Sequence, residues 1–361
     1  MLELYWSAPQ IKARGHPSLL KTQIALMKKL WYTSNPSSPI SLGMPLCYAD
    51  RLRIRQPGDA KFALGPHQDG GSTERWEKEG YGYGGGGVYS AVFRGEWEAY
   101  DPFDASARMH AFTDLYGGLG ACSMFRMWQG WLSMSKTGPG EGTLQVNPLL
   151  KEATAYALLR PFFRPMWKPE QFRDPSKHLD PLNWEFLAGD NITSDLPGAV
   201  PGHGQEFPEG MHPHLELDKT MVNIPEVKPG DYVVWHCDSE LPARMFSASL
   251  TGTAIHAVDR THKGESDSSV LYIPVCPTTK ANAHYVVSQR KAFLKGIPAP
   301  DFPGGVGESG HTRRPDLDFI MTTCDPIGIQ AMGFAKIEAS DEETSGGREA
   351  IQLANKKLGW E

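Results

Sequence analysis

Residues 231–237 read DYVVWHC, a run of apolar and β-branched side chains that begins directly after the turn-forming residues Pro229 and Gly230. A short apolar run bounded by turn residues is typical of a buried β-strand. Similar short runs, separated by glycine or proline, predict further strands at 51–55, 121–134, 142–146, 254–258 and 269–275. The economical interpretation is a mainly β core, a barrel or sandwich, and residues 51–55 (RLRIR) are expected to have one basic face.

Three segments have the apolar spacing of helices and are expected to flank this core. In residues 18–32 the apolar side chains form a stripe along one face, and Ser18 is the expected N-cap. Residues 148–160 and 345–358 are also expected to be helical. Residues 161–213 are rich in proline and polar side chains, which predicts long irregular excursions.

The composition excludes several classes of protein. Of the 361 residues, 40% are hydrophobic and 22% are charged, without a long apolar run, which argues against a disordered chain and against a membrane protein. The formal net charge of −6 disfavours nucleic acid as a partner. We therefore expect one domain over residues 1–361 that acts on a small molecule and has neither nucleic acid nor membrane as a partner.

The cysteines and the N-terminus predict a reducing compartment. The five cysteines are odd in number and widely spaced, and no C-x-x-C occurs, so neither a disulfide framework nor a thiolate zinc site is indicated. The first residues lack the basic start and the apolar core of a secretory signal. Cytoplasmic residence is the resulting expectation.

A histidine and an aspartate two residues apart are the strongest chemical signal in the chain. In the segment LGPHQDGG, His67 and Asp69 would project from the same face of an extended strand. Two ligands from one strand and a histidine from a distant strand form the two-His-one-carboxylate triad of non-haem iron(II) oxygenases, which leaves coordination positions open. The H-x-D pattern occurs by chance in many chains, so it needs a third ligand.

His256 in the segment IHAVD is the predicted third ligand, because it opens the strand that follows the 231–237 strand. His236 is the competitor, although its position inside an apolar strand favours a packed or second-shell role. The pair His212 and His214 is an alternative metal-binding H-x-H motif, and His214 is also a candidate second-shell or substrate-contacting residue.

The chain resembles a known family, the domain-of-unknown-function family 1479 (DUF1479), placed among cupin-type iron(II)- and 2-oxoglutarate-dependent dioxygenases. The resemblance covers nearly the whole chain. It is carried by these motifs: YWSAPQ, DRLRIRQPGD, GPHQDGGSTERW, EAYDPFDA, WQGWLS, GPGEGTLQVNPLLKEATAYALLRPFF, HPHL, KPGDYVVWHCD, IHAVD and LYIP. It implies a double-stranded β-helix, or jelly roll, with iron(II) held by His67, Asp69 and His256, with 2-oxoglutarate as cofactor, and with dioxygen and a small molecule as substrates.

The chain departs from the family pattern at residues 239–254, SELPARMFSASLTGTA, which separate WHCD from IHAVD. An extended surface loop is one interpretation, since the entropy of loop closure rises slowly with length. A retained short intron is the other, because 16 residues correspond to 48 nucleotides and the pattern resumes directly afterwards. The chain is also expected to lack an N-terminal segment that relatives carry.

The second departure concerns the arginine that binds the distal carboxylate of 2-oxoglutarate. Many such enzymes have an arginine ten or more residues after the distal histidine, whereas this chain has KGESDSSV there. A guanidinium, which binds carboxylates bidentately, must come from elsewhere. Arg126 and Arg55 are the main candidates, and Arg260 is the third.

Tryptophans in the predicted strands are expected to lie mainly in the core, and Trp131 is in addition a candidate substrate-contacting residue. The leading hypothesis is an iron(II)- and 2-oxoglutarate-dependent dioxygenase. The alternatives are a metal-binding barrel without oxygenase activity, an inactive product of a truncated or intron-retaining gene, and a cupin isomerase or hydrolase with another divalent metal.

Overall fold

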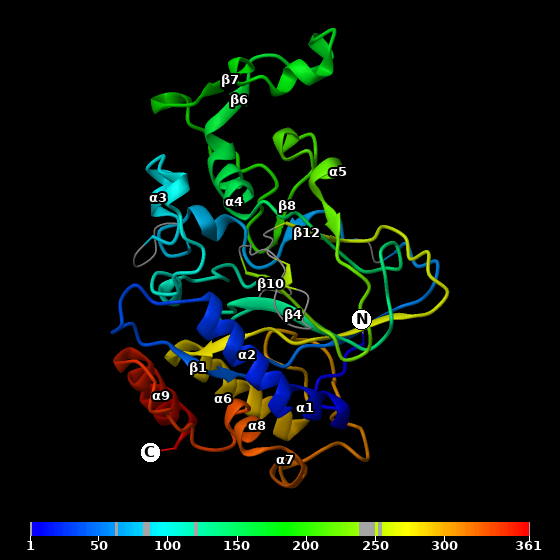
Figure 1. The fold of residues 1–361 in the computed structure, drawn as a ribbon, viewed down its shortest axis with the longest axis vertical. Helices are drawn as coiled ribbons and strands as arrows, with labels where there is room; N and C mark the ends of the chain where they lie inside the picture. The colour runs from blue at the N-terminus through cyan, green and yellow to red at the C-terminus, as the bar shows by residue number, and fades with distance from the viewer. Residues whose placement is uncertain are drawn as a thin grey trace.

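A computed structural model describes residues 2–61, 64–81, 87–118, 122–237, 250–251 and 255–360 of the chain. These residues form a mixed α/β fold with several antiparallel sheets (Figure 1). The strands are β1 (Ser41–Leu46), β2 (Leu52–Arg55), β3 (His67–Gln68), β4 (Trp128–Ser133), β5 (Leu144–Val146), β6 (Phe163–Pro165), β7 (Trp184–Phe186), β8 (Gln205–Glu206), β9 (Val222–Asn223), β10 (Tyr232–His236), β11 (Leu250–Thr251), β12 (His256–Val258), β13 (Ser268–Tyr272) and β14 (Cys276–Thr278). The α-helices are α1 (Ala8–Arg14), α2 (Pro17–Leu30), α3 (Ser90–Phe93), α4 (Leu150–Leu159), α5 (Leu217–Thr220), α6 (Lys280–Lys295), α7 (Leu317–Thr323), α8 (Pro326–Ala331) and α9 (Ser345–Leu358).

The first five-stranded sheet has the order β11-β10-β4-β13-β2 and is antiparallel except for the parallel pair β10–β11. Every residue of β10 is buried. This strand pairs with β4, where Val234 lies opposite Gly130. A strand covered on both faces needs a continuous apolar run, which explains the sequence DYVVWHC.

The second five-stranded sheet has the order β8-β3-β12-β5-β9, and all of its strand pairs are antiparallel. Its strands are only two or three residues long. A hydrophobic cluster joins the two sheets, since it contains Trp131 and Trp235 of the first and Leu144 and Val146 of the second. The two sheets therefore pack against each other over a shared core.

The strands predicted from sequence are present, although each is shorter than predicted. They belong to a mixed α/β fold with separate sheets, and the predicted jelly-roll barrel is not seen among the described residues. The described strands lie in two five-stranded sheets and two two-stranded sheets, β1–β14 and β6–β7, and no closed barrel forms among them. Residues 239–254, predicted as an insertion, lie outside the described residues except for 250–251 in β11.

Helices cover the lower part of the molecule in Figure 1. They come from the N-terminal part of the chain, α1 and α2, and from its C-terminal part, α6 to α9. Helices α6 and α9 pack on each other, and α2 packs on β1. The predicted helix at 18–32 begins earlier, because Pro17 occupies its first turn and the His16 side chain, rather than Ser18, caps it by accepting a hydrogen bond from the Ser18 amide. The helix predicted at 345–358 has those bounds.

The region predicted as irregular, 161–213, contains a small antiparallel pair, β6–β7, joined by short 3₁₀ turns. In Figure 1 this pair lies in an arm at the top, above α4 and away from the helices at the bottom. No helix in the described part of the chain is long and apolar enough to span a membrane.

Replacing Trp128 with alanine should destabilise the fold. Trp128 is fully buried, and its ring packs against Trp31, Phe103 and His236. Truncating such a side chain leaves a cavity, so we expect a loss of about 3–5 kcal/mol in the free energy of unfolding, measured by urea denaturation. As a control, Leu182→Ala removes a side chain that is 84% exposed and should change stability by less than about 0.5 kcal/mol. A similar effect of both substitutions would contradict the assigned core.

Candidate metal centre

The pairing of two short strands brings the predicted ligands together. β3 and β12 are antiparallel neighbours, and His67 is the register partner of His256. Asp69 follows β3 by one residue, so its carboxylate returns to the same side of the sheet as His67. The two histidine rings lie with their centroids 4.2 Å apart.

The donor atoms of these three residues converge on one point. The Nε2 atom of His67 lies 3.5 Å from one carboxylate oxygen of Asp69, and the Nε2 atom of His256 lies 3.4 Å from the other. Ligand atoms of all three residues lie within 4.8 Å of one another. Two imidazole nitrogens and one carboxylate oxygen on one face form a donor set that fits a divalent transition metal and leaves its other side open.

The tautomer of His67 suits metal binding. Its Nδ1 atom lies 2.7 Å from the carbonyl oxygen of Gly65, to which a protonated Nδ1 donates. A hydrogen bond of this kind leaves the Nε2 lone pair directed at the metal position, as in many metal sites.

Electrostatics within the triad keep Asp69 ionised. Burial raises the pKa of Asp69, but the charges and hydrogen bonds of His256 and His67 outweigh it and hold the pKa well below the ordinary value. Burial lowers the pKa of His67, and the hydrogen bond and charge of Asp69 more than reverse this, so the pKa is raised. The carboxylate is thus ready to bind a cation, whereas a proton competes for His67.

The loop that carries Asp69 is held by a buried arginine. Arg75 lies in the 3₁₀ turn Thr73–Trp76 and donates to the carbonyl oxygens of Gly71 and Asp69. Gly70 has a φ of +91°, in the left-handed region that favours glycine. The left-handed conformation at Gly70 and the carbonyl contacts of Arg75 account for a glycine and an arginine in the segment GGSTER that follows the H-x-D motif.

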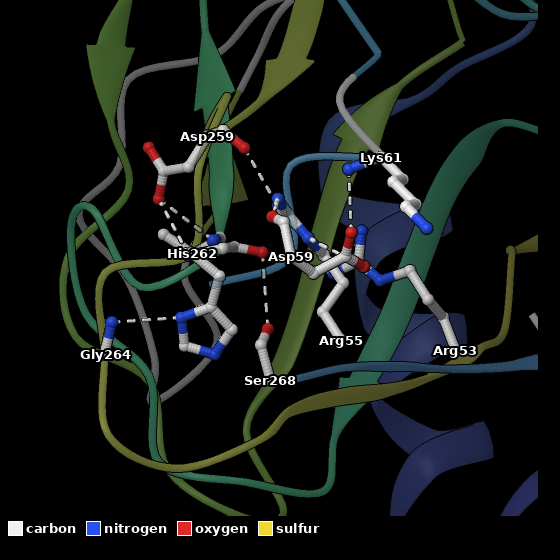
Figure 2. A network of polar contacts seen from close by, with 10 residues as sticks. Arg53, Arg55, Asp59, Lys61, Asp259, His262, Gly264 and Ser268 are labelled. Atoms are coloured by element: carbon white, nitrogen blue, oxygen red, sulfur yellow. Dashed lines mark hydrogen bonds and ion pairs between the residues drawn. The ribbon is translucent and has the colours of Figure 1, made fainter. Parts of the chain in front are cut away.

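The exit of β12 is held by a network around Asp259, which Figure 2 shows. The Asp259 carboxylate accepts hydrogen bonds from the amides of Gly142 and Thr143, at 3.1 and 3.0 Å. Arg55 donates to the carbonyl oxygens of Asp259 and Asp59, at 2.9 and 2.6 Å. Because Arg55 is fully buried in these contacts, it ties β2 to the segment after His256. Arg55, a predicted cofactor-binding residue, thus directs its guanidinium at backbone carbonyls and does not line the cavity beside the triad.

A cavity of about 130 Å³, partly open to solvent, adjoins the triad. It lies between the two large sheets, since both contribute to its wall. It is lined by Tyr48, Asp50, Arg51, Arg53, Leu64, His67, Asp69, Arg126, Gln129, Gly130, Trp131, Leu144, Trp235, His256, Val258, Tyr272, Pro274 and Phe302.

Of the three arginines considered for 2-oxoglutarate, Arg126 lines this cavity and the other two do not. Arg126 makes no hydrogen bond or salt bridge to any residue that the structure describes. Burial lowers the pKa of Arg126, but the electrostatic interactions with Cys122 and Asp69 outweigh burial and hold the pKa above its ordinary value. Arg260 is exposed and lies away from the cavity lining.

The backbone on both sides of Arg126 is fixed by hydrogen bonds. The Asn282 side chain accepts from the Phe125 amide at 2.8 Å and donates to the Phe125 carbonyl oxygen at 2.9 Å. The Met127 amide donates to the Val275 carbonyl oxygen at 2.8 Å. The guanidinium is therefore presented from a fixed backbone.

His236 and His214 do not join the site. His236 is fully buried, stacks on Trp31 at 4.5 Å, and donates to the Pro102 carbonyl oxygen, so it is a packed core histidine. His214 is exposed and contacts Tyr156 and Trp184. His212 is buried, and burial lowers its pKa to about 4, but it bonds Pro197 rather than the triad.

Trp131 lines the cavity and is also part of the core. Its predicted contact with substrate stays a prediction. Cavity residues that the sequence analysis did not single out include Tyr48, Asp50, Arg51 and Tyr272. A signal existed for one of them, because alternation in RLRIR places Arg51 on the basic face of β2. That face points inward, since Arg53 and Arg55 are buried whereas Ile54 is 39% exposed.

Comparison with known proteins supports a family assignment. Residues 1–334 match the model of a family described as Gig2-like. The uncharacterized protein YbiU of Escherichia coli K12 is 31% identical over 331 residues, which cover 91% of this chain and 66% of that protein. The chain thus spans just under two thirds of this curated relative.

Two solved structures are similar in fold. The crystal structure of GlcNAc Inducible Gene 2 (DUF1479) from Candida albicans has a TM-score of 0.79 and 35% identity, and the alignment covers 99% of this chain and 71% of that one. A protein of Salmonella typhimurium LT2, described as a "putative oxidoreductase", has a TM-score of 0.71 and 29% identity, with 91% and 67% covered. The resemblance to DUF1479 predicted from the sequence is confirmed.

Metal affinity should fall as the pH is lowered. Because Asp69 raises the pKa of His67 above its ordinary value of 6.5, protonation of His67 begins to compete with metal at a higher pH than in an unperturbed histidine. We expect cobalt(II) affinity, followed by visible absorption, to drop roughly tenfold per pH unit below that pKa. His214→Ala should leave this profile unchanged. Equal affinity at pH 8 and pH 6 would argue against His67 as a ligand.

Proposed function

This chain belongs to the Gig2-like family, and we propose that it is an iron(II)- and 2-oxoglutarate-dependent dioxygenase that oxidises a small molecule. The observation that carries the proposal is the combination of His67, Asp69 and His256 with an arginine, Arg126, in one cavity. The description of the Salmonella relative as a "putative oxidoreductase" agrees with this reaction class.

The donor set favours iron over metals with other preferences. Two histidines and one carboxylate on one face are the ligands of non-haem iron(II) oxygenases, whereas structural zinc usually takes four protein ligands and calcium takes oxygen ligands. Iron(II) would supply the redox chemistry that activates dioxygen while 2-oxoglutarate is oxidised and decarboxylated.

Arg126 is the proposed anchor of 2-oxoglutarate. A guanidinium binds a carboxylate through two parallel hydrogen bonds, and Arg126 has no such partner among the described residues. Its electrostatic coupling to Asp69 indicates that it lies near the metal position. A dicarboxylate could thus reach the metal with one end and Arg126 with the other.

The remaining walls surround the reacting region with apolar side chains. Trp235 packs against the His256 ring with centroids 5.2 Å apart. Trp131, Leu144 and Val258 add apolar surface to the same cavity. Exclusion of water strengthens the electrostatic interactions within the site and protects reactive species from side reactions.

We further propose that the fold is a variant of the double-stranded β-helix. Two mostly antiparallel five-stranded sheets share one core and enclose the cavity between them, with the triad on one sheet and Trp131 on the other. A jelly roll has the same arrangement of two facing sheets.

Substitution of each ligand should remove metal binding. We expect His67→Ala, Asp69→Ala and His256→Ala each to lower iron(II) affinity at least about 100-fold, since loss of outer-shell partners alone costs 10–100-fold. The measurement is an anaerobic titration with iron(II) and 2-oxoglutarate, followed through the visible charge-transfer band of the chelated complex.

His214→Ala is the matched control, because this histidine is exposed and lies outside the cavity. Full 2-oxoglutarate turnover in any ligand variant would refute the proposal. Iron binding by the unmodified chain without any 2-oxoglutarate-dependent band or turnover would instead favour a metal-binding protein without oxygenase activity, or an isomerase or hydrolase.

Arg126→Met should selectively weaken the binding of 2-oxoglutarate. Removal of a charge-assisted bidentate contact should raise the Kd for 2-oxoglutarate roughly tenfold to 100-fold, with a smaller effect on iron(II) affinity. Arg260→Met serves as the control, since Arg260 is exposed. Equal 2-oxoglutarate affinity in Arg126→Met and the unmodified chain would assign the anchor to another residue.

A further inference from the structure

Arg51 occupies the same cavity in a distinct setting from Arg126. It directly precedes β2, and its guanidinium lies 4.1 Å from the centre of the Phe302 ring. Its Nε atom lies 3.4 Å from a carboxylate oxygen of Asp50. The side chain is 25% exposed, so the cation is partly withdrawn from water and partly open to the cavity.

The guanidinium of Arg51 retains donors for a ligand. An arginine carries five N–H donors, and the long Nε contact to Asp50 is the one side-chain polar contact that Arg51 makes with the described residues. Burial raises the pKa of Asp50, and the charge of Arg51 only partly opposes this. Asp50 therefore contacts Arg51 through its Nε edge, and the two terminal nitrogens make no hydrogen bond to the described residues.

The ring beneath Arg51 is held by contacts that do not depend on a ligand. Asp301, next to Phe302, accepts hydrogen bonds from the Tyr48 hydroxyl at 2.8 Å and from the Ser123 amide and hydroxyl at 2.8 and 2.6 Å. These contacts join three separate segments at the cavity wall. Phe302 is thus a preformed surface on which the cation rests, as cation–π pairs require.

The charges of the cavity favour an additional anion. Its lining contains three arginines, Arg51, Arg53 and Arg126, but only two carboxylates, Asp50 and Asp69. A divalent metal adds two positive charges and a bound 2-oxoglutarate removes two. Arg53 also donates to the Gly142 carbonyl oxygen, so Arg51 and Arg126 are the guanidinium groups of the lining best placed to bind anions, in surroundings that screen charges less than water does.

We propose that Arg51 forms the substrate subsite, which takes a small organic oxyanion, a carboxylate or a phosphate monoester, whose apolar part lies against the aromatic wall. This proposal rests on the proposed oxygenase function for the meaning of "substrate", and it deepens that function by naming the substrate class. Five aromatic side chains line the cavity and supply the apolar surface: Tyr48, Trp131, Trp235, Tyr272 and Phe302. A guanidinium binds both kinds of oxyanion bidentately.

The test uses the full chain without added metal and three probes of similar shape: phenylacetate, phenyl phosphate and phenylacetamide. Isothermal titration should give at least about tenfold tighter binding of one or both anions than of the neutral amide, because only an anion gains the charge-assisted hydrogen bonds. Tighter phenylacetate assigns a carboxylate substrate, and tighter phenyl phosphate assigns a phosphate ester. Equal affinity for all three probes overturns the proposal.

Arg51→Gln should abolish the preference for the anion over the amide, and Arg51→Lys should restore part of it. The control is Arg94→Gln, an exposed arginine paired with Glu96 on the surface. An unchanged anion preference in Arg51→Gln overturns the proposal. If this variant does not fold, as judged by circular dichroism, the comparison of the three probes on the unmodified chain still decides the matter.

Competition separates this subsite from the 2-oxoglutarate site. Saturating 2-oxoglutarate should leave the Kd of the tighter anion within about twofold, whereas displacement of that probe assigns Arg51 to the cofactor and overturns the proposal. Arg51→Gln should weaken binding of the probe more than binding of 2-oxoglutarate. Arg126→Met should weaken binding of 2-oxoglutarate more than binding of the probe.

The failure of either proposal is recognisable. Selective binding of the anion without an iron(II)–2-oxoglutarate band would leave the subsite standing and refute the oxygenase. An iron(II)–2-oxoglutarate band with turnover, but no discrimination between anion and amide, would leave the oxygenase standing and refute the subsite.

Discussion

The pairing of β3 with β12 is the constraint on which the candidate site depends. Each strand is very short, yet their register places His67 opposite His256 and allows Asp69 to bridge the two imidazoles. A shift of one residue would turn one histidine to the other face of the sheet, because side chains alternate along a strand. Much of the nearby polar structure can be understood as fixing this register.

Two buried arginines hold the segments beside the ligands. Arg75 binds the carbonyl oxygens of the Asp69 loop, and Arg55 binds the carbonyl oxygens of Asp59 and Asp259 near the exit of β12. A buried cation is costly without hydrogen-bond partners, so each arginine requires its carbonyls as much as the loops require it. Arg51 and Arg126 have fewer protein partners and face the cavity, which distinguishes guanidinium groups that support the fold from those suited to ligands.

Much of the ligand set was predictable, because H-x-D in an extended segment places two donors on one side and IHAVD offers a histidine at the start of a strand. The choice between His236 and His256 followed from the apolar character of the 231–237 run, and the structure agrees, since His236 stacks on Trp31 in the core. The choice among Arg55, Arg126 and Arg260 was not predictable. Each follows or lies in a plausible strand, and only packing decides whether a guanidinium meets a cavity, a carbonyl or solvent.

The sequence by itself determined the strands, the flanking helices, the family and the three candidate metal ligands, because period-two patterns and short motifs are local properties of the chain. The tertiary structure decided which face of RLRIR is inward and which arginine remains available to an anion. It also decided how the described strands divide into two five-stranded and two two-stranded sheets rather than a closed barrel. These outcomes depend on contacts between segments far apart in the chain, such as Arg51 with Phe302 and His67 with His256. Spacing within one segment carries no information about such contacts.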